Sequence, residues 1–128
     1  APYAPGGELG DCLAVVDFKR LPPERVAALF RPGSFRSQRN VGAVALEWCW
    51  IASGRFQLYL HGGQKLWDYA AGRLIADEAG VVSALFSPEG ADPVHGIDLD
   101  KRVAVAAATR ELYDAWLRFI GLPLKPAS

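Results

Sequence analysis

The sequence has no methionine and only two cysteines, Cys12 and Cys49, among its 128 residues. The cysteines form no Cys-x-x-Cys pair and match no zinc-ligand spacing, which argues against a structural zinc site or a dithiol redox motif. We expect both to be reduced, buried thiols in a cytoplasmic protein, because disulfides are rare in that compartment. A bridge between them is the alternative.

The sequence also lacks net charge, because 14 basic side chains balance 14 acidic ones. Nothing in that balance indicates binding to nucleic acid or to an anionic membrane. No run approaches the length of about 18 uncharged apolar residues that spans a bilayer. No basic segment precedes an apolar stretch as in a signal peptide. We therefore predict neither a nucleic-acid partner nor a membrane partner.

Several catalytic motifs are missing as well. The sequence contains no Walker loop and no Gly-x-Gly-x-x-Gly fingerprint, and its spacing shows no Ser-His-Asp or Cys-His set. The two histidines, His61 and His95, are too few and too scattered to make a metal site by themselves. His95 lies in a predicted loop, where we expect it only to be solvated.

The missing methionine and the opening residues lead to an expectation about the extent of the chain. The sequence begins Ala-Pro-Tyr-Ala-Pro-Gly-Gly, and such closely spaced Pro and Gly residues are typical of a linker. We expect a linker at 1–10, one α/β domain at 11–122 and a tail at 123–128. We also expect a fragment cut at a domain boundary from a longer parent. A short protein that has lost its initiator is the alternative.

The residues that are present alternate between strand and helix patterns. Runs rich in apolar and β-branched residues predict strands at 12–18, 56–61, 81–86 and 102–108. Helical spacing, helix-starting prolines and capping residues predict helices at 22–30, 40–53, 67–79 and 110–120. For the last of these, Thr109 is the predicted cap and Gly121, with Pro123 after it, the predicted end; its residues on one face are Leu112, Trp116, Phe119 and Ile120. We therefore predict a layered α/β sandwich in which helices flank a mixed central sheet.

Asp68 lies in the first turn of the predicted helix 67–79, within the stretch Lys-Leu-Trp-Asp-Tyr-Ala-Ala-Gly. An acidic side chain there interacts favourably with the helix dipole, by about 0.3–1 kcal/mol, which is a purely structural explanation. Two details favour a ligand role instead. The glycines at 62–63 allow close backbone approach, and bulky aromatic residues flank the aspartate on both sides.

Two further candidates lie at element ends. The predicted helix 40–53 opens with Asn-Val-Gly-Ala-Val, and Gly42 leaves backbone N–H groups uncovered, as in an anion site. The alternative there is an ordinary N-cap at Asn40 with close helix packing. His61 ends the strand 56–61 on the face that we predict to be polar. It is either a substrate contact or an ordinary strand-end residue.

Residues 41–80 resemble the C-terminal signature of the inositol monophosphatase family. The matching residues are Trp67, Asp68, Ala70, Ala71, Gly72, Glu78, Ala79 and Gly80 in the signature itself, and Gly42, Ala45, Ala52, Gly54 and Arg55 upstream. Less specific agreement extends from the segment 12–18 to the last helix. The resemblance implies the C-terminal half of a layered αβαβα fold.

The N-terminal half of the family carries a Glu-Glu motif and an Asp-Pro-(Ile/Leu)-Asp-Gly-Thr motif, which hold most of the metal ligands. Neither motif occurs here, and Gly-Ala-Asp-Pro-Val-His-Gly at 90–96 lacks the second aspartate in register. The resemblance thus implies the C-terminal part of a Mg²⁺-dependent phosphatase that hydrolyses a small phosphate monoester, with the N-terminal half of the same protein and a second copy as partners. We expect the isolated chain to be inactive and not to retain Mg²⁺. A non-catalytic interaction or dimerisation module derived from the family is the alternative.

The resemblance also assigns roles to individual residues. Asp68 matches the single C-terminal metal ligand of the family, which also touches the substrate hydroxyl next to the phosphate ester, and its oxygens suit Mg²⁺. Gly42, Ala43 and Val44 match the substrate-contacting turn at the helix start. His61 stands where animal enzymes have a Glu that binds a ring hydroxyl, and Val44 is bulkier than the usual Ala or Ser. Inositol monophosphate, another sugar or polyol phosphate, histidinol phosphate and a nucleotide phosphate therefore all stay open as substrates.

Overall fold

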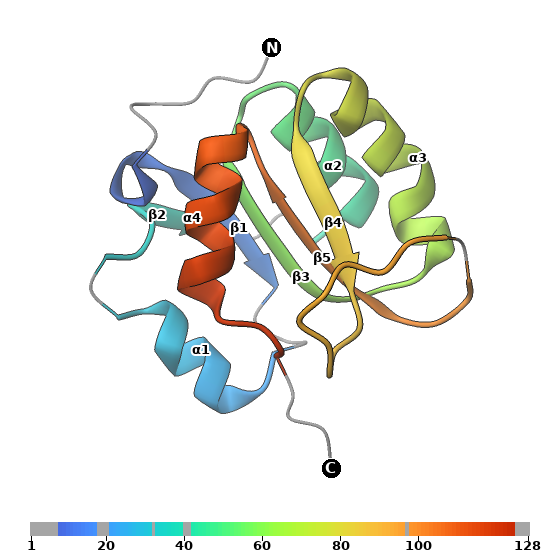
Figure 1. Cartoon of the computed structure of the whole chain (residues 1–128). Coiled ribbons are helices and arrows are strands. Elements are labelled where there is room, and N and C mark those ends of the chain that lie inside the picture. Colours follow the sequence, from blue (N-terminus) through green and yellow to red (C-terminus); the bar gives the residue numbers. More distant parts are fainter. Residues whose placement is uncertain (1–7, 18–20, 32, 40–41, 97, 125–128) are drawn as a thin grey trace.

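The computed structural model describes residues 8–17, 21–31, 33–39, 42–96 and 98–124. A five-stranded sheet, in the order β2-β1-β3-β5-β4, forms its centre (Figure 1). The strands are β1 (Leu13–Asp17), β2 (Ser37–Arg39), β3 (Leu58–Gln64), β4 (Val82–Phe86) and β5 (Arg102–Ala107). Strands β2, β1 and β3 are mutually parallel, whereas β5 runs antiparallel to both β3 and β4. The predicted mixed sheet is therefore confirmed.

Helices cover both faces of this sheet. They are α1 (Pro23–Leu29), α2 (Val44–Ala52), α3 (Leu66–Glu78) and α4 (Arg110–Ile120), preceded by a short 3-10 turn, η1 (Leu9–Asp11). Helices α2 and α3 lie on one face, and α1 and α4 lie on the other (Figure 1). Among the described residues, no helix is both long enough and apolar enough to cross a membrane.

The sheet separates two hydrophobic clusters. On the α4 side, Leu58 and Leu60 pack with Leu112 and Trp116. On the α2–α3 side, Tyr59 packs with other large side chains, which are Val15, Trp48, Ile51, Phe56, Tyr69 and Leu85. Strand β3 is consequently buried on both faces. The prediction that segment 56–61 has a polar face is wrong in this respect. Helices cover the face of the strand that the alternating pattern predicted to be polar.

Other predicted boundaries shift for local reasons. Strand β3 continues to Gln64 through the glycines that we expected to end it, with an irregular register between His61 and Gln64. The short polar strand β2 was not predicted, because its three residues, Ser-Gln-Arg, show no apolar alternation. Helix α2 begins at Val44, not near residue 40, and its N-cap is Ala43. The proposed capping residue Asn40 lies outside the described residues, as do residues 1–7 and 125–128 of the predicted linker and tail.

The cysteines are both free thiols, as expected, but only one of them is buried. Cys12 lies in the core, whereas Cys49 is exposed on α2, so its predicted burial is wrong. The apolar pattern of helix α2 extends around its surface, and one of its exposed positions carries the cysteine.

Helices α2 and α3 pack closely at one point, where Gly72 of α3 meets the ring of Trp48. A Cβ atom at Gly72 would lie 2.5 Å from Cγ of Trp48, which only a glycine avoids. The indole Nε1 of Trp48 in turn donates a hydrogen bond to Oε1 of Gln64 at 3.0 Å. This contact fixes α3 against α2 and the end of β3, and it thereby sets the position of the first turn of α3.

Candidate functional site

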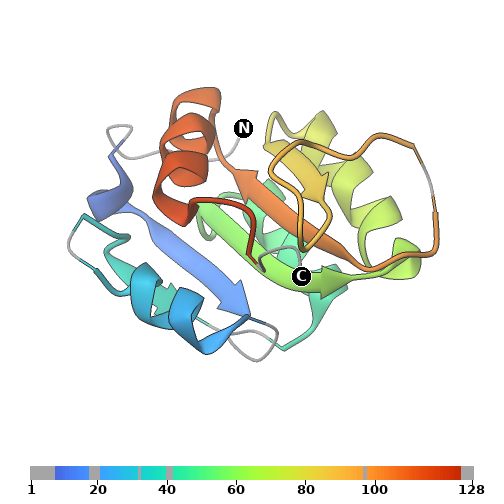
Figure 2. The same ribbon diagram turned by 60° about the horizontal axis from the view of Figure 1, so that its bottom comes forward.

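The predicted site residues lie at one end of the sheet, where the parallel strands finish. Strands β2, β1 and β3 are neighbours and parallel, so their carboxyl ends lie together (Figure 2). Helix α2 follows β2 and helix α3 follows β3, and both helices therefore start near this edge. In open α/β sheets, ligands bind outside the carboxyl ends of the strands. We call this region, from Asp17 through Gly42–Val44 and His61 to Asp68, the carboxyl edge.

Asp68 occupies the third position of α3 and is partly buried. Its Oδ2 accepts a hydrogen bond from the backbone N–H of Lys65, the N-cap residue, at 3.0 Å. This is the returning half of a capping box, so the predicted helix-start role is confirmed. The bond engages one carboxylate oxygen, and a carboxylate has two oxygens that can accept hydrogen bonds or ligate a hard cation.

Asp68 can supply only part of a metal site. Among the described residues, no group of three or more His, Cys, Asp or Glu side chains is arranged to hold a metal ion. Mg²⁺ is usually held by one or two carboxylates together with water and substrate phosphates. Asp68 therefore fits the role of one oxygen ligand.

The N-cap residue of α2 forms no side-chain cap hydrogen bond. Gly42 has a φ of 81°, in the left-handed region that glycine adopts without strain, and a Cβ there would meet nothing within 4 Å. The next residue, Ala43, is the N-cap, and its methyl side chain cannot accept a hydrogen bond from the first turn. Both residues are exposed. The first N–H groups of a helix attract anions, so this turn has the properties of an anion site.

Among the contacts of His61 with described residues, the one with Asp17 was not predicted. Its Nε2 lies 3.0 Å from Oδ2 of Asp17, which ends β1 directly beside it in the parallel register. Its Nδ1 accepts a hydrogen bond from the backbone N–H of Gly63 at 3.2 Å. These two bonds define the neutral tautomer that carries its proton on Nε2. The sequence signal for Asp17 was a lone carboxylate at the end of an apolar strand.

A buried polar network lies beside this pair, on the α2 side of β3. The hydroxyl of Tyr59 donates to Oε1 of Glu47 at 2.7 Å and accepts from Nε2 of Gln64 at 2.8 Å. Burial, together with the charge of Glu47, raises the pKa of the Tyr59 hydroxyl far above its usual value. Tyr59 therefore stays protonated and keeps donating to Glu47. Sequence reasoning missed this network, although a glutamate within the apolar helix α2 was a signal for it.

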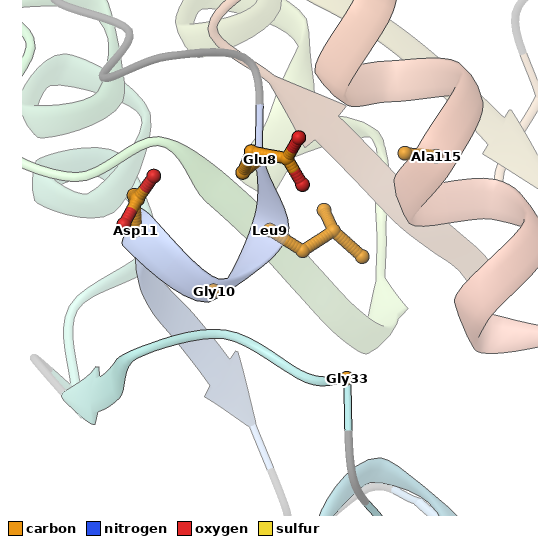
Figure 3. Close-up of a pocket in the computed structure, with 6 residues that line it drawn as sticks. All are labelled: Glu8, Leu9, Gly10, Asp11, Gly33 and Ala115. Carbon is orange, nitrogen blue, oxygen red and sulfur yellow. The ribbon is translucent and has the colours of Figure 1, made fainter.

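A surface hollow of about 570 Å³ lies elsewhere (Figure 3). Its lining comes from Glu8 and η1, from Gly33, and from Ala115 of α4. Because η1 precedes β1, this hollow lies at the amino end of that strand, opposite the carboxyl edge. It contains none of the residues that the sequence singled out.

Comparison with known sequences agrees with this picture. The Inositol-1-monophosphatase SuhB of Mycobacterium tuberculosis is 39% identical over 87 residues, which is 68% of this chain and 29% of that protein. Inositol monophosphatase 1 of Solanum lycopersicum is 40% identical over 88 residues, which is 68% of this chain and 30% of that protein. The matched region thus spans less than a third of the length of these relatives.

Comparison with solved structures agrees on the fold. Mycobacterium tuberculosis SuhB superposes with a TM-score of 0.71 and 28% identity, covering 93% of this chain and 44% of that one. An IMPase/NADP phosphatase complexed with Mg²⁺ and phosphate gives a TM-score of 0.71 at 22% identity, covering 94% of this chain and 43% of that one. The model of the inositol monophosphatase family matches residues 16–119. This match covers most of the chain, which therefore belongs to the inositol monophosphatase family.

Proposed function

We propose that this chain is the C-terminal part of a Mg²⁺-dependent phosphatase that hydrolyses a small phosphate monoester, and that the carboxyl edge forms one wall of its active site. One observation carries the proposal: a carboxylate at the start of α3 occurs at the same edge of the sheet as the exposed start of α2, whose N-cap Ala43 forms no side-chain cap hydrogen bond. A carboxylate attracts a cation and a helix start attracts a phosphate, which together suit a phosphate ester with its metal ion. The names of the relatives support the same activity.

The residues of the carboxyl edge take distinct roles in this proposal. Asp68 is the catalytic metal ligand and also contacts the substrate. Mg²⁺, when bound, supplies positive charge that stabilises the phosphate during hydrolysis. The related IMPase/NADP phosphatase that holds Mg²⁺ and phosphate supports this choice of metal. Gly42, Ala43 and Val44 contact the substrate through the first turn of α2, and His61 belongs to the substrate-side wall.

The substrate class is a small phosphorylated polyol or sugar, such as an inositol monophosphate. Such a molecule carries one phosphate and several hydroxyl groups. The N–H groups at the start of α2 suit the anionic phosphate. The carboxylate of Asp17, held by His61, offers acceptor oxygens on the same edge of the sheet for the hydroxyl groups.

The partner of this chain is the N-terminal half of the same protein. Four large apolar side chains are exposed on α2 and α3: Leu46 by 43%, Trp67 by 72%, Leu74 by 61% and Ile75 by 49%. In this proposal these exposed apolar side chains belong to a surface that another unit covers. The matched relatives are more than twice as long as the region they share with this chain, and in this proposal an N-terminal half covers the exposed side chains.

The proposal is tested by phosphate release from the full-length parent and from this chain alone, each with Mg²⁺. We expect the parent to turn over and the isolated chain to be inactive, because the metal-ligand motifs of the N-terminal half are absent from this chain. Asp68→Asn in the parent should reduce turnover by about 100-fold or more, the loss that removing one electrostatic contact to a transition state causes. Asp77→Asn, at an exposed position of the same helix, is the matched control and should have no effect. Robust turnover by the isolated chain would contradict this account.

The second candidate is a non-catalytic interaction or dimerisation module. The exposed apolar side chains of α2 and α3 favour it, since a second copy or another protein can cover them as well. It predicts that Asp68→Asn leaves the parent fully active in its cellular role and that neither parent nor variant releases phosphate. Sedimentation of the isolated chain measures whether it forms dimers, and Leu74→Glu should then shift it to monomers.

A further inference from the structure

Asp17 lies at the centre of the carboxyl edge. It is the last residue of β1, and β1 lies between β2, which leads to the turn before α2, and β3, which leads to α3. Asp17 is therefore flanked on one side by the strand leading to the anion-binding turn at Gly42–Val44. On its other side it is flanked by the strand leading to Asp68. Its side chain is 15% exposed, so it is partly accessible at this edge.

His61 is poorly suited to contact a ligand directly. Its side chain is only 6% exposed, and its two ring nitrogens are engaged by Asp17 and by the N–H of Gly63. A neutral imidazole has one donor and one acceptor, and both are used in these bonds. A ligand that approaches this position therefore meets the more exposed carboxylate of Asp17 before it meets the ring.

We propose that Asp17 is a specificity-determining residue that accepts a hydrogen bond from a substrate hydroxyl, and that His61 is its positioning residue. An ionised carboxylate only accepts hydrogen bonds, and it accepts several at once, so its bond to His61 is compatible with another from a ligand. The hydroxyl groups of a polyol or sugar are the complementary donors. Hydrogen bonds to charged acceptors are the stronger ones, which makes this contact selective for hydroxylated esters.

This inference rests on the proposed phosphatase function, and its test separates the two. The experiment compares myo-inositol 1-phosphate with cyclohexyl phosphate, which has the same ring without the hydroxyls. KM and kcat are measured on the full-length parent with Mg²⁺. Kd is measured by calorimetry with Ca²⁺, which takes the same oxygen ligands, in place of Mg²⁺. The variants are Asp17→Asn, His61→Phe and the control Asp77→Asn.

For Asp17→Asn we expect KM and Kd for myo-inositol 1-phosphate to rise by roughly 10- to 100-fold, the effect of losing a hydrogen bond to a charged group. KM for cyclohexyl phosphate and kcat for both esters should change by less than about twofold. His61→Phe should raise the KM for myo-inositol 1-phosphate by a smaller factor, because Asp17 loses the hydrogen bond that positions its carboxylate. A role confined to joining β1 and β3 would change the KM of both esters by the same factor, and that result would overturn the inference.

The remaining outcomes distinguish the role of Asp17 from the phosphatase function. If the wild-type parent hydrolyses and binds both esters equally well, the role of Asp17 is refuted and the phosphatase function stands. If the parent hydrolyses neither ester but binds the polyol ester in a manner that depends on Asp17, the site stands and the phosphatase function is refuted. Binding of neither ester refutes both. If Asp17→Asn does not fold, His61→Phe decides: a KM for myo-inositol 1-phosphate that is unchanged in that variant refutes the inference.

Discussion

The contact between Gly72 and Trp48 predicts that Gly72→Ala destabilises the protein, although alanine is the better helix former. A Cβ at residue 72 would lie 2.5, 2.6 and 2.7 Å from Cγ, Cβ and Cδ1 of Trp48. These atoms form the base of the indole, which is fully buried, so it cannot swing aside like the end of a flexible chain. The ring is also held by its hydrogen bond to Gln64 and by an edge-to-face contact with Tyr59 at 5.1 Å.

Three contributions determine how much Gly72→Ala lowers the free energy of unfolding. Overpacking a well-filled core costs about 1–3 kcal/mol, and this rigid contact belongs at the upper end. Displacing Trp48 also weakens its buried hydrogen bond to Gln64, at about 1 kcal/mol. Alanine recovers about 1 kcal/mol through its helix propensity. The expected net loss is about 2–3 kcal/mol in the free energy of unfolding.

The assay is urea unfolding followed by circular dichroism, which does not depend on tryptophan fluorescence. The matched control is Ala71→Gly at the neighbouring exposed position, where only propensity changes and a loss of about 1 kcal/mol is expected. In a Trp48→Leu background, where the smaller side chain makes room, Gly72→Ala should become neutral or stabilising. A Gly72→Ala protein as stable as wild type, or more stable, would refute the close packing of α2 on α3.

Two further predictions concern ionisable groups. Burial, followed by the charge of Asp11, raises the pKa of the Cys12 thiol to about 11. A maleimide at pH 8 should therefore modify the exposed Cys49 and leave Cys12 intact. Mass spectrometry of the peptides measures this, and rapid labelling of Cys12 in the folded protein would contradict the prediction. The hydrogen bond from Arg102 lowers the pKa of the Asp98 carboxyl, so the stabilisation from this pair is present above the unfolded-state pKa and is lost as the pH falls through the folded-state pKa. An NMR titration should give a midpoint for Asp98 below its ordinary value, and Arg102→Gln should move it upward; an unchanged midpoint would show that the pair is absent in solution.

Helix α4 shows how much of the fold was predictable from local sequence. Thr109 was predicted as its cap, and its Oγ1 accepts from the backbone N–H of Leu112 at 3.2 Å. Gly121 was predicted to end it and does so in the left-handed conformation, with a φ of 68°. The residues predicted to share one face of α4, namely Leu112, Trp116, Phe119 and Ile120, are all buried. Each of these features depends on residues within a few positions of one another, so the local pattern contains the necessary information.

The candidate site also has some features that the local sequence predicts and others that it does not. The sequence by itself determined the α/β class and the place of Asp68 in the first turn of a helix. It also determined the bare helix start at Gly42, although it placed the first residue of that helix too early. Capping and helical periodicity are short-range effects, and a single stretch of sequence specifies them.

Only the tertiary structure decided the surroundings of His61. The parallel register of β1 and β3 joins it to Asp17, 44 positions earlier in the sequence, and the covering helices bury the face of β3 that looked polar. The network of Tyr59, Glu47 and Gln64 forms because the same helices exclude water from the sheet. Strand register and helix coverage are set by packing between distant segments, so no local pattern could specify which polar groups would meet at the carboxyl edge.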